Sequence, residues 1–345
     1  MIASPYLLYL GHVNDEVGIK TSRGLAVFRP DDCVGEFRHD DCELTLGLPR
    51  MGFAEAVAAG ARTLVLGIAN AGGKLGDDLV RDAVAAIEAG LDVASGLHNR
   101  LRDEPALVEA ARRHGRALHD VRDPRPDIPI GNGKRRAGKR LLAVGTDCSV
   151  GKMYATLCLE RAMRARGMTA DFRATGQTGI LIAGSGVPLD AVIADFISGA
   201  IEQLSPPRED DGWDLIEGQG SLFHPSFAGV STGLLHGAQP DALVLCHDPV
   251  RPHMRGLPHY PMPGLRETLD ANLQVARLTN PDVRAVGVAL NTSKLPAAEA
   301  ERLCAETADA LGLPCTDPFS MGVDPIIDWI VKCFEPSPRK ATLSL

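Results

Sequence analysis

The sequence is poor in aromatic residues and has no Cys-X-X-Cys pair among its eight cysteines. Aromatic side chains make up 4% of the 345 residues, so we expect a core built mainly from Ala, Val, Leu and Ile. In a chain of this length, scattered cysteines are typical of reduced thiols and not of a disulfide framework or a zinc site. These features predict a cytoplasmic protein.

Features of exported, membrane-bound and nucleic-acid-binding proteins are also missing. The first residues lack the basic start and apolar core of a signal peptide, and no apolar run approaches the length of a membrane span. The net charge of −8 argues against a surface that binds nucleic acid. We therefore expect a soluble globular protein with a small-molecule partner and no membrane or nucleic-acid partner.

The N-terminal part alternates short apolar runs with helix-like runs. We expect strands over residues 6–10, 24–28, 63–66, 91–94 and 117–121, helices over 54–59, 77–89 and 104–114, and a solvated loop over 31–42. This alternation predicts an α/β domain whose parallel sheet is covered by helices on both faces.

A second domain follows a basic linker that contains three prolines. We place the boundaries at residues 1–122 for the N-terminal domain, 123–140 for the linker, 141–335 for the second domain and 336–345 for a polar tail. Within the second domain we expect strands over 141–144, 170–174, 213–216, 242–246, 284–290 and 314–317, and helices over 154–166, 190–204, 269–278 and 296–311.

One glycine-rich stretch lies between a strand and a helix of the second domain. It consists of Gly145, Thr146, Asp147, Cys148, Ser149, Val150, Gly151, Lys152 and Met153, and its glycines are one residue further apart than in a standard phosphate-binding loop. Backbone N–H groups and the helix dipole of such a loop hold phosphate oxygens. Met153 stands where Ser or Thr would bind Mg²⁺, so we expect pyrophosphate binding without triphosphate hydrolysis. The alternative is a glycine-rich turn without a ligand.

Three further strand ends carry polar side chains. We expect Thr175, Gln177, Thr178, Gln219 and Ser221 to bind substrate, and Glu217 or His247 to accept a proton. A loop with five prolines then contains Arg251 and Arg255, which suit a ligand with carboxylates. The alternative for this loop is a rigid surface segment with incidental charges.

Together, these motifs resemble the D-glutamate N-acetyltransferase-like proteins, a family long catalogued as a domain of unknown function. The resemblance covers nearly the whole chain and implies a Rossmann-like N-terminal domain followed by a P-loop NTPase-like α/β domain, with mostly parallel sheets. It also implies transfer of acetyl from acetyl-CoA to D-glutamate or a related D-amino acid, without a tightly bound cofactor. We expect no metal and a homo-oligomer.

The phosphate loop also resembles that of dethiobiotin synthetase, in which Gly-Thr-Asp likewise opens a loop of the longer spacing. In that enzyme Thr follows the lysine, whereas Met153 does so here. Two alternative functions therefore stay open, namely an ATP-dependent ligase or kinase and a non-catalytic nucleotide-binding regulator.

Overall fold

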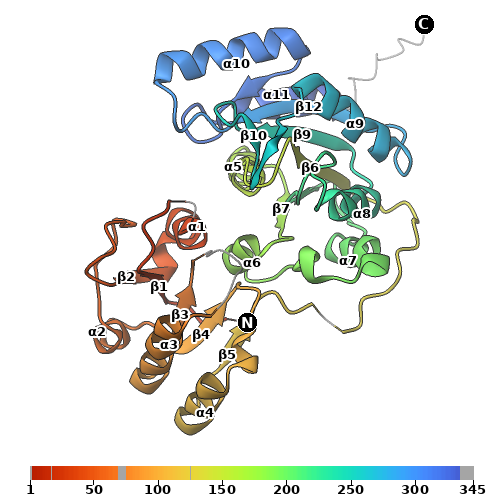
Figure 1. Ribbon diagram of the computed structural model, residues 1–345. Coiled ribbons are helices and arrows are strands. Elements are labelled where there is room, and N and C mark those ends of the chain that lie inside the picture. Colours follow the sequence, from red (N-terminus) through yellow and green to blue (C-terminus); the bar gives the residue numbers. More distant parts are fainter. Residues whose placement is uncertain (1, 17, 69–74, 125, 335–345) are drawn as a thin grey trace, which may run out of the picture. The chain divides into compact units, whose positions relative to one another are not determined.

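The computed structural model describes residues 2–16, 18–68, 75–124 and 126–334, which form two compact units (Figure 1). The first unit contains Met1–Pro126 together with Ala174–Ala191. The second unit contains Asp127–Arg173 and Val192–Leu345. The predicted tail of residues 336–345 lies outside the described residues.

The first unit is a five-stranded sheet in which every neighbouring pair of strands is parallel. The strand order is β2 (Cys33–Arg38), β1 (Tyr6–Gly11), β3 (Thr63–Leu66), β4 (Asp92–Ser95) and β5 (Leu118–Asp120). Its helices are α1 (Lys20–Phe28), α2 (Phe53–Ala58), α3 (Asp77–Ala89), α4 (Pro105–His114) and α6 (Gln177–Ala183). The core consists of aliphatic side chains such as Leu7, Leu64, Ile87 and Leu107, which are fully buried.

Two predictions for the first unit are wrong. Residues 24–28, predicted to be a strand, form the end of α1, because a short apolar run fits a half-buried helix as well as a strand. The predicted loop over residues 31–42 contains the edge strand β2. In β2, Glu36 is fully buried and accepts hydrogen bonds from Thr45 Oγ1 at 2.8 Å and from the Leu46 amide at 2.6 Å. Because Glu36 makes its hydrogen bonds inside the fold, its polar character did not indicate a solvated loop.

The second unit is a six-stranded parallel sheet. Its strand order is β13 (Cys315–Thr316), β12 (Arg284–Leu290), β9 (Ala242–His247), β6 (Lys139–Gly145), β8 (Trp213–Ile216) and β7 (Ala170–Arg173). The helices are α5 (Lys152–Ala165), α7 (Ile197–Leu204), α8 (Ala228–Ala238), α9 (Leu265–Arg277), α10 (Ala297–Leu311) and α11 (Asp324–Phe334). An antiparallel hairpin, β10 (His253–Met254) and β11 (Leu257–Pro261), lies outside this sheet. The two parallel sheets confirm the predicted α/β class.

The chain after β7 departs most from the prediction. Residues 190–204, predicted to be one helix, form 3₁₀ turns at Leu189–Ala191 and Ala194–Phe196 before α7 begins. Residues 174–191 belong to the first unit, where α6 packs against α1. The predicted second domain is therefore interrupted by a segment that completes the first unit.

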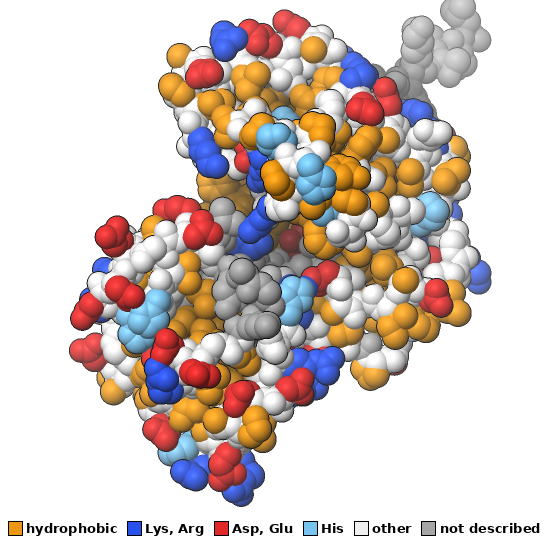
Figure 2. All heavy atoms as spheres, in the orientation of Figure 1, with side chains coloured by type: hydrophobic (Ala, Val, Ile, Leu, Met, Phe, Trp, Pro, Cys, Tyr) orange, Lys and Arg blue, Asp and Glu red, His pale blue; other side chains and the backbone are white. Residues whose placement is uncertain are grey.

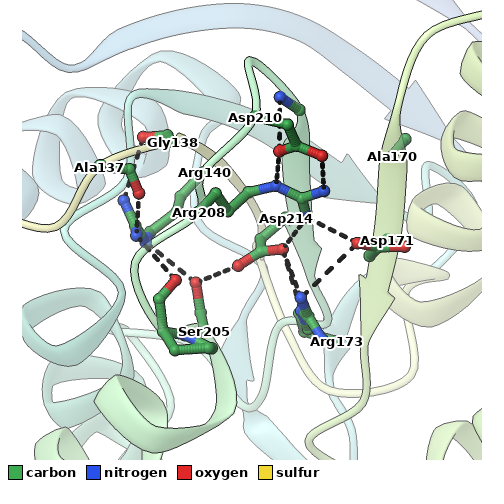
Figure 3. Close-up of polar contacts among 12 residues, drawn as sticks. Ala137, Gly138, Arg140, Ala170, Asp171, Arg173, Ser205, Arg208, Asp210 and Asp214 are labelled. Carbon is green, nitrogen blue, oxygen red and sulfur yellow. Dashed lines mark hydrogen bonds and ion pairs between the residues drawn. The ribbon is translucent and has the colours of Figure 1, made fainter.

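A buried ion-pair network is centred on Asp214, near the start of β8 in the second unit (Figure 3). Asp214 of β8 is fully buried and accepts hydrogen bonds from Arg173 Nη2 at 2.9 Å, Arg208 Nη1 at 2.7 Å and Ser205 Oγ at 2.6 Å. Arg140 of β6 in turn donates to Ser205 Oγ at 3.0 Å. This network links β6 and β8 near their starting ends, whereas the phosphate loop follows the other end of β6.

The surface has no single dominant charge on the face that Figure 2 shows. Acidic and basic side chains are interspersed there, in keeping with the modest net charge. None of the helices that the structure describes combines the length and apolar character needed to cross a lipid bilayer.

Candidate functional site

The phosphate loop lies between the central strand β6 and helix α5, at the carboxyl end of the second sheet (Figure 1). β6 ends at Gly145, and α5 begins at Lys152. Gly151, with φ of 99°, and Ser149, with φ of 53°, both have left-handed backbone conformations. Only glycine adopts the conformation of Gly151 without strain. The turn leads into the N-terminus of α5, where unpaired N–H groups and the helix dipole favour an anion.

The side chain of Lys152 is buried against the loop. Its Nζ donates to the carbonyl oxygens of Asp147 at 2.7 Å and Gly220 at 2.8 Å. Burial lowers the pKa of the ammonium, while four nearby ionisable groups raise it, namely Cys148, Cys246, Asp147 and Glu217. An ammonium carries three donors, and the described residues occupy two of them. One donor therefore remains for a ligand oxygen.

Asp147 is the centre of the loop's hydrogen bonds. The residue is fully buried, and its Oδ1 accepts from the Cys148 amide at 2.6 Å. Its Oδ2 accepts from Arg251 Nη1 at 2.9 Å and from the Arg255 amide at 2.7 Å. Because both oxygens are engaged, Asp147 holds the shape of the loop.

Arg251 and Arg255, predicted to bind substrate carboxylates, contact the phosphate loop. Arg251 also donates to the carbonyl oxygens of Cys148 at 2.8 Å and Ser149 at 2.9 Å, and to Asp248 Oδ2 at 3.3 Å. Arg255 donates through Nη1 to Ser149 Oγ. These contacts give the arginines a bracing role that the sequence did not indicate. Their binding of a substrate carboxylate stays a prediction.

His247 lies at the end of β9 and contacts the start of the loop. Its Nδ1 is 2.9 Å from Thr146 Oγ1. Burial lowers the pKa of His247 to about 4; Asp248 raises it in part and Arg251 lowers it further. The imidazole is therefore neutral at neutral pH and is a weak base. His247 is therefore better suited to orient the side chain of Thr146 than to abstract a proton.

The segment after β8 packs closely on the loop. Glu217 is 5% exposed, and Ser221 Oγ donates to the Thr146 carbonyl oxygen at 3.0 Å. Gly218 lies so close to β6 that an added Cβ would be 1.7 Å from the Ala143 carbonyl oxygen. The Gln219 carbonyl oxygen accepts a hydrogen bond from a serine of α8 at 2.8 Å. The second sheet thus brings the predicted residues of this segment to the phosphate loop.

Three other predicted substrate-binding residues, Thr175, Gln177 and Thr178, belong to the first unit. Thr178 Oγ1 is 2.7 Å from Thr21 Oγ1 of α1, and Gln177 Oε1 accepts from Arg122 Nη1 at 3.1 Å. These contacts attach α6 to the first unit.

One residue near the loop was missed by the sequence reasoning. Asp147, Cys148 and His224 place potential metal-ligand atoms within 4.8 Å of one another. Nδ1 of His224 accepts from the Ser226 amide at 3.2 Å, and its buried Nε2 has no hydrogen-bond partner among the described residues. The expectation that the chain holds no metal stays a prediction. One feature of the sequence could have pointed to His224, namely its position three residues after the predicted site residue Ser221.

Comparison with known proteins identifies the family. A model described as a domain of unknown function, the DUF1611_C P-loop domain, matches residues 129–327. A second model, the DUF1611_N Rossmann-like domain, matches residues 35–124. The chain belongs to the DUF1611 family. The predicted order of a Rossmann-like domain followed by a P-loop domain is confirmed.

Relatives of this DUF1611 chain match almost its whole length. A crystal structure of a DUF1611 family protein from Anabaena variabilis ATCC 29413 has a TM-score of 0.88 at 33% identity and covers 96% of this chain and 100% of that chain. Two curated relatives are named D-glutamate N-acetyltransferase. One, from Tritonibacter scottomollicae, is 53% identical over 95% of this chain, and one from a Pseudoalteromonas species is 50% identical over 94%; each match covers 98% of the relative. The predicted family resemblance is confirmed.

Proposed function

We propose that this DUF1611 chain is an N-acetyltransferase that moves the acetyl group of acetyl-CoA to the amine of D-glutamate. The observation that carries the proposal is the 53% identity, over 95% of the chain, to a relative named D-glutamate N-acetyltransferase. The names of the relatives support the enzyme class. The donor and the acceptor are our inference, and both are open to direct test.

The chemistry of the phosphate loop supports coenzyme A as the ligand. Coenzyme A carries a pyrophosphate, which suits the N-terminus of α5 and the remaining donor of Lys152. Met153 supplies a thioether where a nucleotide-hydrolysing loop has a hydroxyl for Mg²⁺. A loop of this kind is suited to hold a pyrophosphate without cleaving it.

Acetyl transfer then requires a neutral amine, a polarised thioester carbonyl and alignment of the two. The amine nitrogen forms a bond to the carbonyl carbon, and the carbon–sulfur bond breaks as the coenzyme A thiolate leaves. Because an amino acid is mainly an ammonium ion near neutral pH, one proton must first be removed. A proton acceptor is therefore a required part of the enzyme.

One assay separates this proposal from its alternatives. Purified protein is incubated with acetyl-CoA and either D- or L-glutamate, and free thiol is measured; a parallel sample receives ATP and Mg²⁺, and phosphate is measured. We expect acetyl-CoA to release thiol in the sample with D-glutamate and not in the sample with L-glutamate. Phosphate release would instead support an ATP-dependent ligase or kinase, and no turnover in either sample would support a nucleotide-binding regulator.

We also propose that the enzyme works in the cytoplasm, which the free state of all eight cysteines supports.

Our candidates for substrate contacts remain the five polar residues predicted from the sequence, namely Thr175, Gln177, Thr178, Gln219 and Ser221. Substitution of each by alanine, with KM measured for both substrates, tests these assignments.

A further inference from the structure

A buried histidine beside the phosphate loop uses only one of its two ring nitrogens. His224 is 3% exposed, and its Nδ1 accepts a hydrogen bond from the Ser226 amide at 3.2 Å. Its Nε2 is buried and has no hydrogen-bond partner among the residues that the structure describes. Buried polar groups in folded proteins are nearly always paired, so an unpaired one indicates a place for a ligand or an ordered water.

The bond from Ser226 determines what the unpaired nitrogen of His224 can do. A ring nitrogen that accepts an amide hydrogen uses its lone pair for that bond, so the hydrogen of the imidazole lies on Nε2. Nε2 is therefore a hydrogen-bond donor. The partner that a buried donor binds most strongly is an oxygen with negative charge.

The imidazole of His224 is held in a fixed position. The ring of Phe227 lies against it, with centroids 4.4 Å apart and an interplanar angle of 30°. The His224 amide donates to the Ser221 carbonyl oxygen at 3.1 Å, and the His224 carbonyl oxygen accepts at 3.0 Å from the amide of Ala228, the first residue of α8. A donor that is fixed in advance loses little conformational freedom when it binds a ligand.

The segment that carries His224 is attached to the phosphate loop. Ser221 Oγ donates to the Thr146 carbonyl oxygen at 3.0 Å, and Lys152 Nζ donates to the Gly220 carbonyl oxygen at 2.8 Å. All of these residues belong to the second unit. The position of His224 at the loop therefore follows from contacts within one unit.

His224 lies beside the residues that open the phosphate loop. One of its ring nitrogens is within 4.8 Å of a carboxylate oxygen of Asp147 and of the thiol sulfur of Cys148. The carboxylate of Asp147 already accepts from Arg251 Nη1 and from the Arg255 amide. The unpaired donor is thus left over in the region where the N-terminus of α5 favours an anion.

We propose that His224 is a further diphosphate-binding residue of the phosphate loop, which donates a hydrogen bond from Nε2 to a phosphate oxygen. Lys152 and His224 then bind the diphosphate from two different segments of the chain. This inference rests on the proposed function, in which the diphosphate belongs to coenzyme A. A nucleoside diphosphate offers the same chemistry, so the experiment has to separate the two sources.

A purely structural role for His224 is the alternative. The bond from the Ser226 amide to Nδ1 supports the turn before α8 and would by itself explain why the ring is buried. That role makes no use of Nε2. The two roles therefore depend on different nitrogens of one ring, and each nitrogen can be replaced separately.

The test uses two amide side chains that each reproduce one nitrogen of the ring. His224→Asn keeps an acceptor near Nδ1 for the Ser226 amide but has no donor at the position of Nε2. His224→Gln is long enough to place a donor near Nε2. The control is His114→Gln, whose histidine is exposed on α4 of the first unit. Calorimetry on the full chain, in EDTA, measures the binding of inorganic pyrophosphate, coenzyme A and ADP, and circular dichroism establishes that each variant folds.

We expect His224→Asn to weaken the binding of pyrophosphate and of coenzyme A about ten- to a hundredfold, because a hydrogen bond to a charged group is lost. His224→Gln should restore most of this affinity. His114→Gln should stay within about twofold of the wild type, the range of an ordinary surface change. A loss for pyrophosphate and ADP without a loss for coenzyme A would assign the diphosphate to a nucleotide and contradict coenzyme A as its source.

Three outcomes would overturn the inference. The first is wild-type affinity for pyrophosphate in His224→Asn. The second is an equal loss in His224→Asn and His224→Gln, since the ring would then only support the turn. The third is a wild type that binds pyrophosphate with a divalent metal but not in EDTA, because Nε2 would then be a metal ligand and not a donor.

A measurement on the wild type decides the question if His224→Asn does not fold. In protein with ¹⁵N-labelled imidazoles, added pyrophosphate should shift the Nε2 signal of His224, which is identified by its absence in His224→Gln. An unchanged signal at saturating pyrophosphate would contradict the inference. Failure of the proposed function is a separate result, because the wild type would then release no thiol from acetyl-CoA, whereas none of these binding measurements requires turnover.

Discussion

Arg251 and Asp147 form an ion pair, with Nη1 and Oδ2 2.9 Å apart, that fastens the proline-rich segment of residues 247–264 to the phosphate loop. The pair is largely enclosed, because the side chain of Asp147 is fully buried and that of Arg251 is 21% exposed. Arg251 makes two further bonds to loop carbonyl oxygens. The phosphate loop is therefore held both by the guanidinium of Arg251 and by the ammonium of Lys152.

This bracing predicts the effect of Arg251→Ala. We expect the KM for acetyl-CoA to rise about ten- to a hundredfold, because a hydrogen bond to a charged group contributes about 1.5–3 kcal/mol. Arg251→Lys should restore this only in part, since lysine lacks the planar fork. Arg302→Ala, which removes an exposed pair with Glu306, is the matched control. A rise confined to the KM for D-glutamate would instead support the predicted carboxylate-binding role.

Lys152→Ala removes the ammonium that faces the loop. We expect a large rise in the KM for acetyl-CoA, roughly ten- to a hundredfold, and little change in the KM for D-glutamate. Burial lowers the pKa of Lys152, so its charge is lost at a lower pH than that of an ordinary lysine. Wild-type affinity for coenzyme A, measured by calorimetry, should therefore fall as pH rises into the alkaline range. An affinity that does not change between wild type and variant would contradict this role.

Met153→Thr restores the hydroxyl that Mg²⁺-binding loops have at this position. We expect the wild type to bind coenzyme A equally well with EDTA and with Mg²⁺, because a thioether is a poor Mg²⁺ ligand. The variant should bind ATP more tightly in Mg²⁺ than in EDTA. Calorimetric titrations of both proteins under the two conditions measure the difference. A strict Mg²⁺ requirement in the wild type would mean that another residue holds a metal.

His247 should make stability depend on pH in the acid range. Its pKa is about 4 in the folded protein, against an ordinary value of about 6.5. Between these values the unfolded chain binds a proton that the folded protein does not, so the free energy of unfolding falls as pH falls. The loss amounts to about 3 kcal/mol by pH 4. His247→Asn keeps a polar group near Thr146 but does not titrate, so its denaturant-measured stability should fall by less over the same range.

Asp214→Asn tests the buried network in Figure 3. Neutralising Asp214 weakens its hydrogen bonds with Arg173 and Arg208, which keep Asp171 and Asp210 as partners, so we expect a cost of about 1.5–3 kcal/mol. We expect a lower urea midpoint with unchanged kcat, since the network lies at the opposite end of the strands from the phosphate loop. Glu306→Gln, which alters an exposed ion pair, should shift the midpoint little.

Periodicity and loop motifs predicted the parallel sheets and the place of the phosphate loop, because both depend on residues that are neighbours in sequence. The contacts between the loop and distant residues were not predictable in the same way. Nothing local indicates that Arg251 reaches Asp147, which lies 104 residues earlier. Likewise, Gly24–Phe28 has an apolar composition that fits a strand, and only packing in the first unit selects the helix.

A pair of stacked histidines in the first unit shows a second limit of the sequence. His12 and His39 each follow a strand, but their stacking depends on the pairing of β1 with β2. The sequence predicts a loop over residues 31–42, so it gives no pairing of β2 from which to place His39 next to His12. An error in one edge strand therefore concealed the stacking of the two histidines.

The return of residues 174–191 to the first unit has a practical consequence for dissecting the protein. The backbone passes from one unit to the other at three points, so a single cut cannot release either unit whole. A fragment ending at Pro126 would lack α6 and expose the face of α1 that α6 covers, including Thr21. Recombinant halves of this protein should aggregate or remain inactive unless a peptide spanning residues 174–191 is supplied or grafted onto the N-terminal fragment.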